Sequence, residues 1–353
     1  MPLAELALEN IRCIERAELA LADGTTLIRG PNASGKTSIL EGIYLLGRGR
    51  SFRTRNTERL IRHDNATLRV NGRMNGVVDQ RIRISIARGA PVAAEISGSS
   101  VRSLAELAQA FPVQVIEPGI HRLVEEGSPR RRRWLDWAVF HVEPRFIINW
   151  QRYSRVLKQR NAALRAAQTD TARAWDLELI RYGEAMTAER RQLLAVLAPY
   201  WQESVQRLAG VSAQLRYTPG WNQDLSLSEA LVVSFARDRA RGVSHVGPHR
   251  ADVQIRIDGR PAREVASRGQ QKLLAIAMVM AQLKMLRDRT DLVPTLLLDD
   301  PAAELDTDRL ARFVAEVQAL RCQLVLTSLE LHLESFGPAE RVFHVEHGRV
   351  KQG

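Results

Sequence analysis

The segment Gly30–Thr37 reads Gly-Pro-Asn-Ala-Ser-Gly-Lys-Thr and matches the pattern G-x-x-x-x-G-K-T at every fixed position. It follows the apolar run Thr25–Ile28 and precedes the helix-like stretch Ser38–Leu46, so we expect a strand, a loop and a helix in that order. Glycines let several backbone N–H groups turn toward one phosphate chain, and a helix N-terminus adds partial positive charge. The alternative, an ordinary Gly/Ser turn before a helix, does not account for the full match.

The residues of this loop have distinct expected roles in holding ATP. Lys36 is placed to reach the β- and γ-phosphates, and the Thr37 hydroxyl to ligate Mg²⁺. Only five of the 51 basic side chains are Lys, so a Lys retained here fits a need for a compact ammonium. The other residues expected to contact the nucleotide are Gly30, Asn32, Ser34, Gly35 and Ser38.

A second chemical signal is the apolar run Thr295–Leu298, which ends in Asp299 and Asp300. A buried strand that ends at a phosphate site supplies the acidic partner of the metal. We therefore expect Asp299 to bind Mg²⁺ and Asp300 to orient or deprotonate the attacking water. A strand running into an ordinary acidic turn is the alternative, and the upstream phosphate loop disfavours it. The expected catalytic residues are Lys36, Asp299 and Asp300.

The order of elements predicts an α/β fold whose nucleotide-binding sheet is built from both chain ends. Residues 1–100 and 245–353 are expected to form this lobe, and residues 101–244 a mainly helical second lobe. Within the first lobe, hairpin strands are expected near 67–71, 81–88 and 92–97, with turns at Asn71-Gly72 and Arg88-Gly89. A helix break is expected at Thr169–Thr171.

Composition restricts the cellular compartment and the cysteine chemistry that we expect. No stretch approaches 18 consecutive apolar residues, and the first residues carry charges without an apolar signal core, so a cytoplasmic protein is expected. Cys13 and Cys322 are expected to be buried free thiols, since no partner motif supports a disulfide, a zinc site or a redox pair.

The net charge of +11 favours a polyanionic partner, nucleic acid first. Two segments, 48–83 and 122–165, each carry a net charge of +7, so a localised DNA-binding surface is expected. If about six of these cations contact phosphates, log affinity should fall with log salt at a slope of about −5. The alternative is that Arg130–Arg133 and their neighbours pair with carboxylates. Trp134 and Trp137 are expected in the core rather than under a base.

The segment Ser267-Arg268-Gly269-Gln270-Gln271 opens a long expected helix and resembles the signature motif of ABC-type ATPases. Glu304-Leu305-Asp306 resembles their D-loop. In that family the signature of one subunit faces the γ-phosphate held by the other subunit. The resemblance therefore implies an ATP-driven homodimer in which Ser267, Gly269 and Gln270 contact the partner's nucleotide.

Over nearly its whole length the chain resembles the RecF family of SMC-like recombination mediators. The segments that carry the resemblance are Leu8–Arg12, Leu40–Tyr44, Gly49–Thr54, Arg130–Asp136, Lys158–Asn161, Gly247–Asp252 and Ser267–Lys272. The resemblance implies an ABC-type ATPase head without a long coiled coil, and weak, DNA-stimulated ATP hydrolysis. It also implies DNA binding near single-strand/double-strand junctions, and action with RecO and RecR to load RecA during gap repair and SOS induction. An ABC-type ATPase subunit powering another machine is the alternative function.

Several positions depart from the pattern or stay open. The family usually has Gly at the position of Ala33, and transporter ATPases have Glu at the position of Asp300. The expected strand Gln323–Thr327 runs into Ser328 without the switch histidine, so slow turnover is expected. Gln114 is a candidate metal-sensing residue. Gly242–Asp252, with His245 and His249, is either a structural turn or a contact with nucleotide or DNA.

Overall fold

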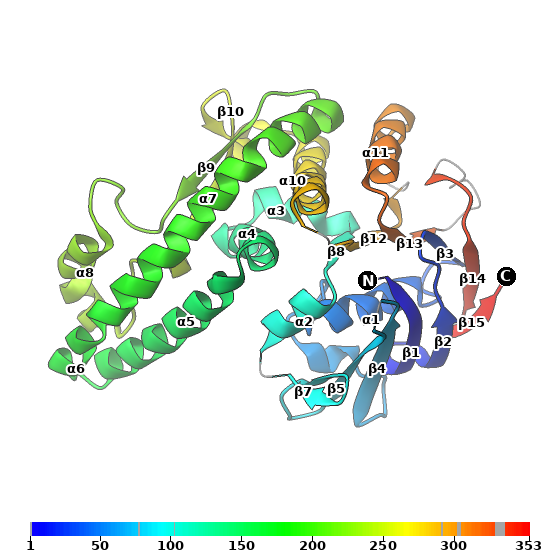
Figure 1. Cartoon of the computed structure of the whole chain (residues 1–353), viewed down its shortest axis with the longest axis horizontal. Helices are drawn as coiled ribbons and strands as arrows, with labels where there is room; N and C mark the ends of the chain where they lie inside the picture. The colour runs from blue at the N-terminus through cyan, green and yellow to red at the C-terminus, as the bar shows by residue number, and fades with distance from the viewer. Residues whose placement is uncertain (1, 77, 102, 291, 302–304, 329–335) are drawn as a thin grey trace. The chain divides into compact units, whose positions relative to one another are not determined.

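The computed structural model describes residues 2–76, 78–101, 103–290, 292–301, 305–328 and 336–353 (Figure 1). Contacts between Cα atoms divide the chain into unit 1, residues 1–120 with 286–353, and unit 2, residues 121–285. These bounds differ from the expected ones at 100 and 245. Residues 113–116 pair with a strand of unit 1, whereas residues 252–257 pair only with strands of unit 2.

The first sheet of unit 1 has the strand order β15-β14-β3-β13-β12-β8. Its strands are β3 Thr25–Arg29, β8 Val113–Ile116, β12 Thr295–Asp299, β13 Gln323–Ser328, β14 Arg341–Glu346 and β15 Arg349–Gln352. All neighbouring pairs are parallel except β14 with β15. Strands β3 and β8 from the first 120 residues thus lie in one sheet with strands from Thr295 onward, and the carboxyl ends of the parallel strands share an edge. The expected α/β class, with an ATPase-type sheet built from both chain ends, is confirmed.

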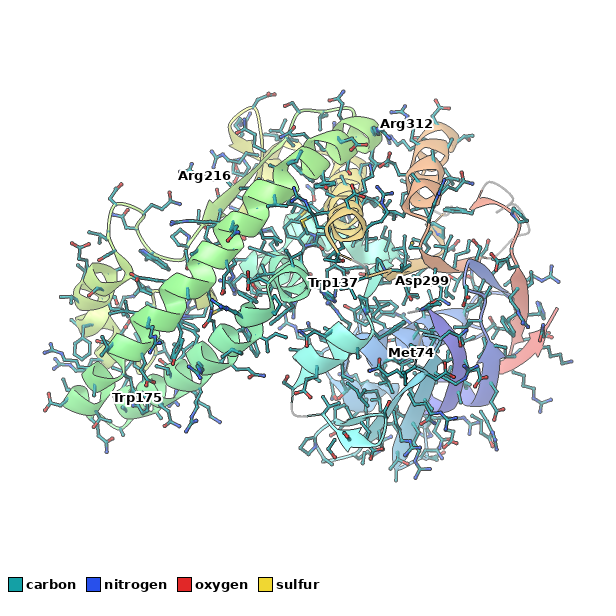
Figure 2. The ribbon with its side chains drawn as sticks, viewed as in Figure 1. Met74, Trp137, Trp175, Arg216, Asp299 and Arg312 are labelled. Carbon is teal, nitrogen blue, oxygen red and sulfur yellow. The ribbon has the colours of Figure 1, made fainter. Side chains whose placement is uncertain are left out.

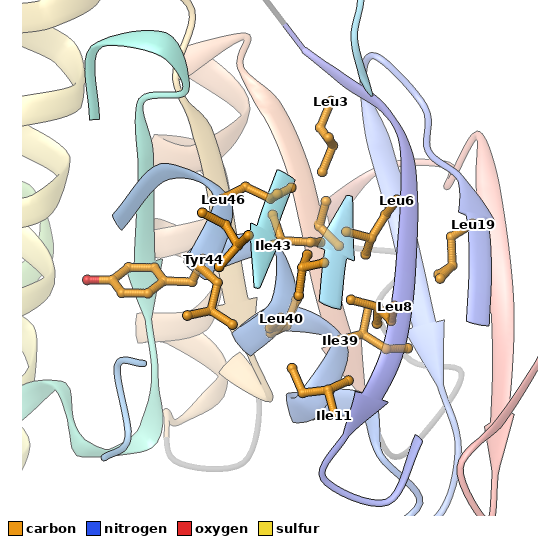
Figure 3. Close-up of a cluster of buried hydrophobic side chains, with 14 of the residues drawn as sticks. Leu3, Leu6, Leu8, Ile11, Leu19, Ile39, Leu40, Ile43, Tyr44 and Leu46 are labelled. Atoms are coloured by element: carbon orange, nitrogen blue, oxygen red, sulfur yellow. The ribbon is translucent and has the colours of Figure 1, made fainter. Parts of the chain in front are cut away.

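The second sheet of unit 1 is antiparallel and has the order β2-β1-β4-β5-β6-β7. Its strands are β1 Leu3–Ile11, β2 Ile14–Ala20, β4 Thr67–Met74, β5 Gln80–Ala87, β6 Ala93–Ile96 and β7 Ser99–Ser100. Their apolar faces pack with helix α1, Lys36–Arg48, which buries Ile39, Leu40 and Ile43 completely (Figure 3). The helix that follows the phosphate loop is therefore fixed in an extended cluster of buried apolar side chains.

One expected turn in this sheet is wrong and one is right. Asn71-Gly72 lies inside β4, paired with both β1 and β5. The glycine has a packing role there, because a Cβ atom at Gly72 would lie 2.4 Å from a methyl of Leu46. Arg88-Gly89 does follow β5 as a turn, and Gly89 has φ +71°.

Unit 2 is mainly helical, as expected. Its helices are α3 Arg122–Glu125, α4 Ser128–Val142, α5 Pro144–Arg165, α6 Thr169–Ala174, α7 Asp176–Ala209, α8 Leu227–Arg241, α9 Ala262–Val265 and most of α10 Arg268–Arg289. Helices α5 and α7 pack side by side (Figure 1). A three-stranded sheet contains β9 Gln214–Thr218, β10 Asp252–Ile257 and β11 Arg260–Pro261. No long coiled coil occurs in the described ranges. The chain also forms α2 Leu104–Ala110, α11 Thr307–Leu320 and the 3-10 turns η1 Thr57–Leu60, η2 Pro118–His121 and η3 Pro248–Arg250.

The helix break in unit 2 lies just before its expected position. Helix α5 ends at Arg165, and Ala167 adopts φ +57°. Thr169–Thr171 then begins α6 rather than interrupting a helix. The break therefore comes from a left-handed alanine after α5, and the polar Thr-Asp-Thr run starts the next helix.

The exposure of the two cysteines and of two tryptophans can be compared with the expected burial. Cys13 and Cys322 are both free, but Cys13 is exposed, so its expected burial is wrong. Trp134 and Trp137 are 5% and 1% exposed, which confirms their place in the core. Figure 2 labels Trp137. None of the helices in the described part of the chain combines the length and apolar character needed to span a membrane.

Candidate functional site

The phosphate loop connects β3 to α1 and depends on positive φ angles. Gly30, Ala33 and Gly35 have φ of 153°, 62° and 118°. A Cβ atom at Gly30 would lie 2.1 Å from the carbonyl oxygen of Val345. Glycine is therefore required at that position by packing. Ala33 occupies a left-handed conformation that an L side chain adopts at a cost of about 1–2 kcal/mol, which explains why glycine suits this position better.

Lys36 points into the loop. Its Nζ donates hydrogen bonds to the carbonyl oxygens of Gly30 and Pro31 at 2.6 and 2.9 Å. Burial lowers the pKa of Lys36, while the carboxylates of Asp300 and Asp299 act in the opposite direction. The ammonium is thus held inside the loop, next to two carboxylates at the end of β12.

Thr37 and Asp299 meet across 262 positions of sequence. The Thr37 hydroxyl donates to the Asp299 carboxylate at 3.0 and 3.2 Å. Thr327 at the end of β13 donates to Asp299 Oδ1 at 2.9 Å and accepts the Asp300 N–H at 3.0 Å. Burial raises the pKa of Asp299, and the hydrogen bonds from Thr327 and Thr37 oppose this effect. The two oxygens expected to bind Mg²⁺, from Thr37 and Asp299, are therefore already adjacent.

Two charged residues near Asp299 were missed as site residues. The positive charge of Arg53 lowers the pKa of Asp299, and the negative charge of Glu117 raises it. Arg53 is exposed, and its guanidinium donates no hydrogen bond to any residue in the described ranges. Glu117 directly follows β8, so the rule that ligands bind at the carboxyl ends of parallel strands identifies it.

Gln114 does not reach that edge of the sheet. It lies inside β8, paired with Leu296, three positions before Asp299 on β12. At about 3.3 Å per residue its backbone lies about 10 Å from the level of Asp299. The side chain is 6% exposed. The metal-sensing role of Gln114 stays a prediction, and Glu117 lies closer to the end of β12 along the sheet.

A buried carboxylate organises the segment that carries Arg53. Glu41 on α1 accepts hydrogen bonds from Arg12 Nε and Nη2 at 3.0 and 3.1 Å and from the Ser51 hydroxyl. Ser51 Oγ in turn accepts the N–H groups of Arg53 and Thr54 at 3.0 and 3.1 Å. Three of the segments that carry the family resemblance thus converge on Glu41, which fixes the turn before Arg53.

The signature residues belong to unit 2, at the start of α10. Ser267 Oγ accepts the Gln270 N–H at 3.3 Å, and Gln270 Oε1 accepts the Ser267 N–H at 2.9 Å. This reciprocal pair is a capping box, which the Ser-x-x-Gln spacing indicates from sequence. Ser267 and Gly269 are both exposed, so the N-terminus of a 22-residue helix is open to an anion.

The residues resembling a D-loop are only partly described. Glu304 lies outside the described residues. Asp306 caps α11, because its Oδ1 accepts the Arg309 N–H at 2.9 Å. A capping role accounts for this aspartate without any contact with nucleotide.

The residues of the loop fit a bound nucleoside triphosphate with its metal. Ser34 Oγ is buried in the loop and has no hydrogen-bond partner in the described part of the chain. Asn32 is exposed at the loop tip, and Ser38 is buried in the first turn of α1. An anion inside the curl would satisfy the orphaned hydroxyl and the ammonium of Lys36. Thr37 and Asp299 supply the hard oxygen ligands that Mg²⁺ prefers.

Many arginines of the two basic segments form ion pairs with acidic side chains. In segment 48–83, arginines pair with acids of other strands and turns, in the pairs Arg69–Glu9, Arg73–Glu5, Arg83–Glu95 and Arg62–Glu15. In segment 122–165, Arg131 pairs with Asp252, and Arg160 with Asp176 and Asp238. Much of the positive charge in both segments is therefore paired with carboxylates. This is the alternative that the sequence left open for Arg130–Arg133 and their neighbours.

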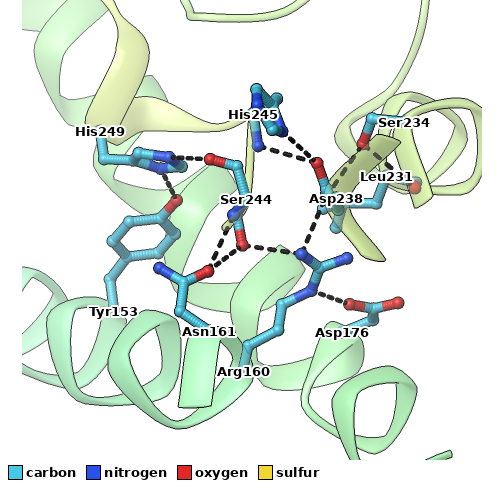
Figure 4. Close-up of polar contacts among 10 residues, drawn as sticks. All are labelled: Tyr153, Arg160, Asn161, Asp176, Leu231, Ser234, Asp238, Ser244, His245 and His249. Carbon is cyan, nitrogen blue, oxygen red and sulfur yellow. Dashed lines mark hydrogen bonds and ion pairs between the residues drawn. The ribbon is translucent and has the colours of Figure 1, made fainter. Parts of the chain in front are cut away.

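The turn Gly242–Asp252 is held by a buried polar network (Figure 4). His249 Nε2 lies 3.1 Å from the Ser244 carbonyl oxygen, and Nδ1 lies 2.7 Å from the Tyr153 hydroxyl. A carbonyl only accepts, so Nε2 carries the proton and Tyr153 donates to Nδ1. His245 Nδ1 contacts Asp238 at 2.9 Å. Both histidines therefore stabilise the turn, and both ring nitrogens of His249 are used by these contacts.

The His249 contact makes stability depend on pH. Burial lowers the pKa of His249 from 6.5 to about 4, so the unfolded chain binds more protons than the folded chain between these values. The contribution of His249 is fully present above pH 6.5 and is lost as pH falls toward 4. We expect the free energy of unfolding to fall by about 2 kcal/mol from this group between pH 7 and pH 5. Urea unfolding at both pH values measures it, and His249→Gln should show a correspondingly smaller difference. An equal pH dependence in both proteins would contradict the assignment.

Comparison with known proteins agrees with the geometry. The family model described as RecF/RecN/SMC N terminal domain matches residues 2–351. A DNA replication and repair protein RecF of Thioalkalivibrio sulfidiphilus is 39% identical over 360 residues, covering 100% of both chains. A protein of the same description from Shewanella piezotolerans is 36% identical over 356 residues, covering 99% of each.

Two solved structures have a similar fold. The recombination mediator protein RecF-ATP in the RecFOR pathway superposes with a TM-score of 0.89 at 24% identity, covering 99% of this chain and 97% of that one. An SMC head bound to the C-winged helix domain of ScpA gives a TM-score of 0.58 at 16% identity, covering 100% and 97%. The fold is thus that of an SMC-type ATPase head, and with full-length identity of 36–39% to curated relatives the chain belongs to the RecF family.

Proposed function

We propose that this protein is an ATP-dependent DNA-binding protein of recombinational gap repair and SOS induction. ATP and Mg²⁺ are its cofactors, and it hydrolyses ATP weakly, with stimulation by DNA. The observation that carries the proposal is the junction of the phosphate loop with β12 and β13, where Thr37, Asp299 and Thr327 form one hydrogen-bonded group.

Each residue of this site has a separate proposed role in binding or hydrolysing ATP. Lys36 already has its ammonium inside the loop and exchanges the carbonyls of Gly30 and Pro31 for phosphate oxygens. Thr37 and Asp299 hold the metal ion, which neutralises charge on the phosphates. Asp300 orients the attacking water, and its backbone is fixed by Thr327. Because an aspartate carboxylate stands one methylene further back than a glutamate, we expect slow hydrolysis suited to a timed clamp.

The exposed start of α10 supports the dimer. Ser267 and Gly269 present a hydroxyl and helix N–H groups, which are good ligands for a γ-phosphate of a second subunit. In this proposal two copies enclose two ATP molecules, and the dimer grips DNA near single-strand/double-strand junctions. RecO and RecR act with it to load RecA, in keeping with the RecFOR pathway named for the similar solved structure. The proposed compartment is the cytoplasm.

Sedimentation of the full chain tests the proposal directly. With non-cleavable ATP and Mg²⁺ the protein should sediment as a dimer, and gapped DNA should cosediment only when nucleotide is present. In a salt series the log–log slope of DNA affinity should be about −5. If the protein dimerises with ATP but does not bind DNA at any salt concentration, the result would instead support an ATPase subunit powering another machine. A protein that stays monomeric with saturating nucleotide would refute the dimer.

A further inference from the structure

The loop Gly247–Ala251 is held from three helices at once. Arg190 of α7 donates to the Pro248 carbonyl oxygen at 2.7 Å, and Arg132 of α4 donates to the Ala251 carbonyl oxygen at 2.6 Å. Tyr153 of α5 donates to His249 within the loop. Such a set of buried contacts around five residues fixes the backbone and the direction of its side chains.

The one exposed side chain on this rigid loop is a cation. Arg250 is exposed, and its guanidinium has no hydrogen-bond or ion-pair partner in the described part of the chain. The charged groups around the loop, taken with their ion-pair partners, are five arginines and four aspartates, namely Arg131, Arg132, Arg160, Arg190, Arg250, Asp136, Asp176, Asp238 and Asp252. Five positive charges against four negative ones leave an excess of one. The positive charges of Arg190 and Arg250, added to burial, lower the pKa of Arg132.

Helix α5, which contacts the loop through Tyr153, also carries positive charge, although at 100° per residue its exposed cations lie about 80–160° around the helix axis from Tyr153. Its 22 residues include no Asp or Glu. The exposed cations along it are Arg145, Arg152, Arg155, Lys158 and Arg165. At 1.5 Å per residue, the stretch from Arg145 to Arg165 is about 30 Å long, close to one turn of duplex DNA.

We propose that Arg250, displayed on the clamped loop beside α5, contacts a backbone phosphate of bound DNA. Exposed cations spread along the length of a helix suit a long polyanion better than a small anion, which needs an enclosed site. The planar guanidinium matches the phosphate geometry, and a preset loop lowers the entropy lost on binding. The structure thus assigns a DNA-contact role to the exposed arginine of a turn whose other polar side chains are structural. This inference rests on the proposed DNA binding.

Fluorescence anisotropy with labelled gapped DNA, ATP and Mg²⁺ tests the contact in the full chain. We compare the unaltered protein with Arg250→Ala and Arg250→Lys across a salt series. Arg216→Ala is the matched control, because Arg216 is an exposed arginine of the same unit on β9 (Figure 2). Losing one phosphate contact should reduce the magnitude of the log–log slope by about 0.9 and weaken binding about eight-fold at 0.1 M salt.

The outcomes separate the contact from a general charge effect. The proposal is supported if Arg250→Ala reduces the slope while Arg250→Lys and Arg216→Ala keep it. Equal losses in Arg250→Ala and Arg216→Ala, or an unchanged slope in Arg250→Ala, would overturn the contact while leaving DNA binding itself established. If the unaltered protein binds no DNA with ATP at any salt concentration, the proposed function fails and this inference with it.

Discussion

Lys36→Arg should lower ATP turnover by at least about 100-fold, because a pocket built for a slim ammonium cannot seat a planar guanidinium. Lys36 is 8% exposed and lies between the carbonyl oxygens of Gly30 and Pro31. The larger group must either leave the loop or displace its backbone. Steady-state ATP hydrolysis and sedimentation with non-cleavable ATP measure the effect, and ATP-dependent dimerisation should be lost as well. Turnover and dimerisation equal to those of the unaltered protein would contradict the role given to Lys36.

Mixing two inactive variants distinguishes a shared site from a self-contained one. Ser267→Arg should also be inactive, because it places a bulky cation at the exposed start of α10. A mixed dimer has one site with both residues altered and one site with both intact. Equimolar mixing of Lys36→Arg with Ser267→Arg should therefore restore up to about a quarter of full activity if dimers form at random. If sedimentation shows that mixed dimers form and activity still does not recover at any ratio, each subunit works alone.

Asp136→Ala should destabilise unit 2 by about 3–5 kcal/mol, because it leaves a buried guanidinium without its counter-charge. Asp136 accepts both Nε and Nη2 of Arg190 at 2.8 and 3.0 Å, and the two side chains are 12% and 2% exposed. Urea unfolding followed by the fluorescence of buried Trp137 measures the loss. The same change should loosen the loop that carries Pro248, since Arg190 also holds its carbonyl oxygen.

Two matched variants separate burial from mere ion pairing. Glu126→Ala breaks the partly exposed pair with Arg130 on α4 and should cost less than about 1 kcal/mol. The double variant Asp136→Leu with Arg190→Met removes both charges and should recover most of the stability. If Asp136→Ala lowers the free energy of unfolding no more than Glu126→Ala does, the buried pair of Asp136 and Arg190 does not stabilise unit 2 in the way proposed.

The sequence predicted those parts of the fold that depend on short-range signals. The match at Gly30–Thr37 and the acidic end of the run Thr295–Leu298 located the loop and strand of the ATP site, and the structure brings Thr37 and Asp299 together. The dipeptide signal predicted a turn at Asn71-Gly72 that does not form, because this glycine is required by packing against Leu46 inside β4.

The sequence could not predict which residues far apart in the chain contact one another in the fold. The sequence left open whether the basic segments bind DNA or pair with carboxylates, because nothing local reveals that Arg160 lies between Asp176 and Asp238. Gln114 was favoured for its residue type, whereas strand register places Glu117 at the edge of the sheet. Register and burial are properties of the folded chain, so these assignments needed the structure.

The position of β3 in its sheet has a consequence for synthesis on the ribosome. Both of its neighbours, β13 and β14, come from the last 31 residues of the sequence, Gln323 onward. At 5–20 residues per second, the strand that leads into the phosphate loop waits roughly 15–60 s after emerging before either neighbour is made. During that time both of its edges are unpaired, which is a hazard for aggregation. The nascent chain therefore cannot gain stability from nucleotide until β13 and β14 have been synthesised, and chaperones that shield unpaired strands should matter most for this unit.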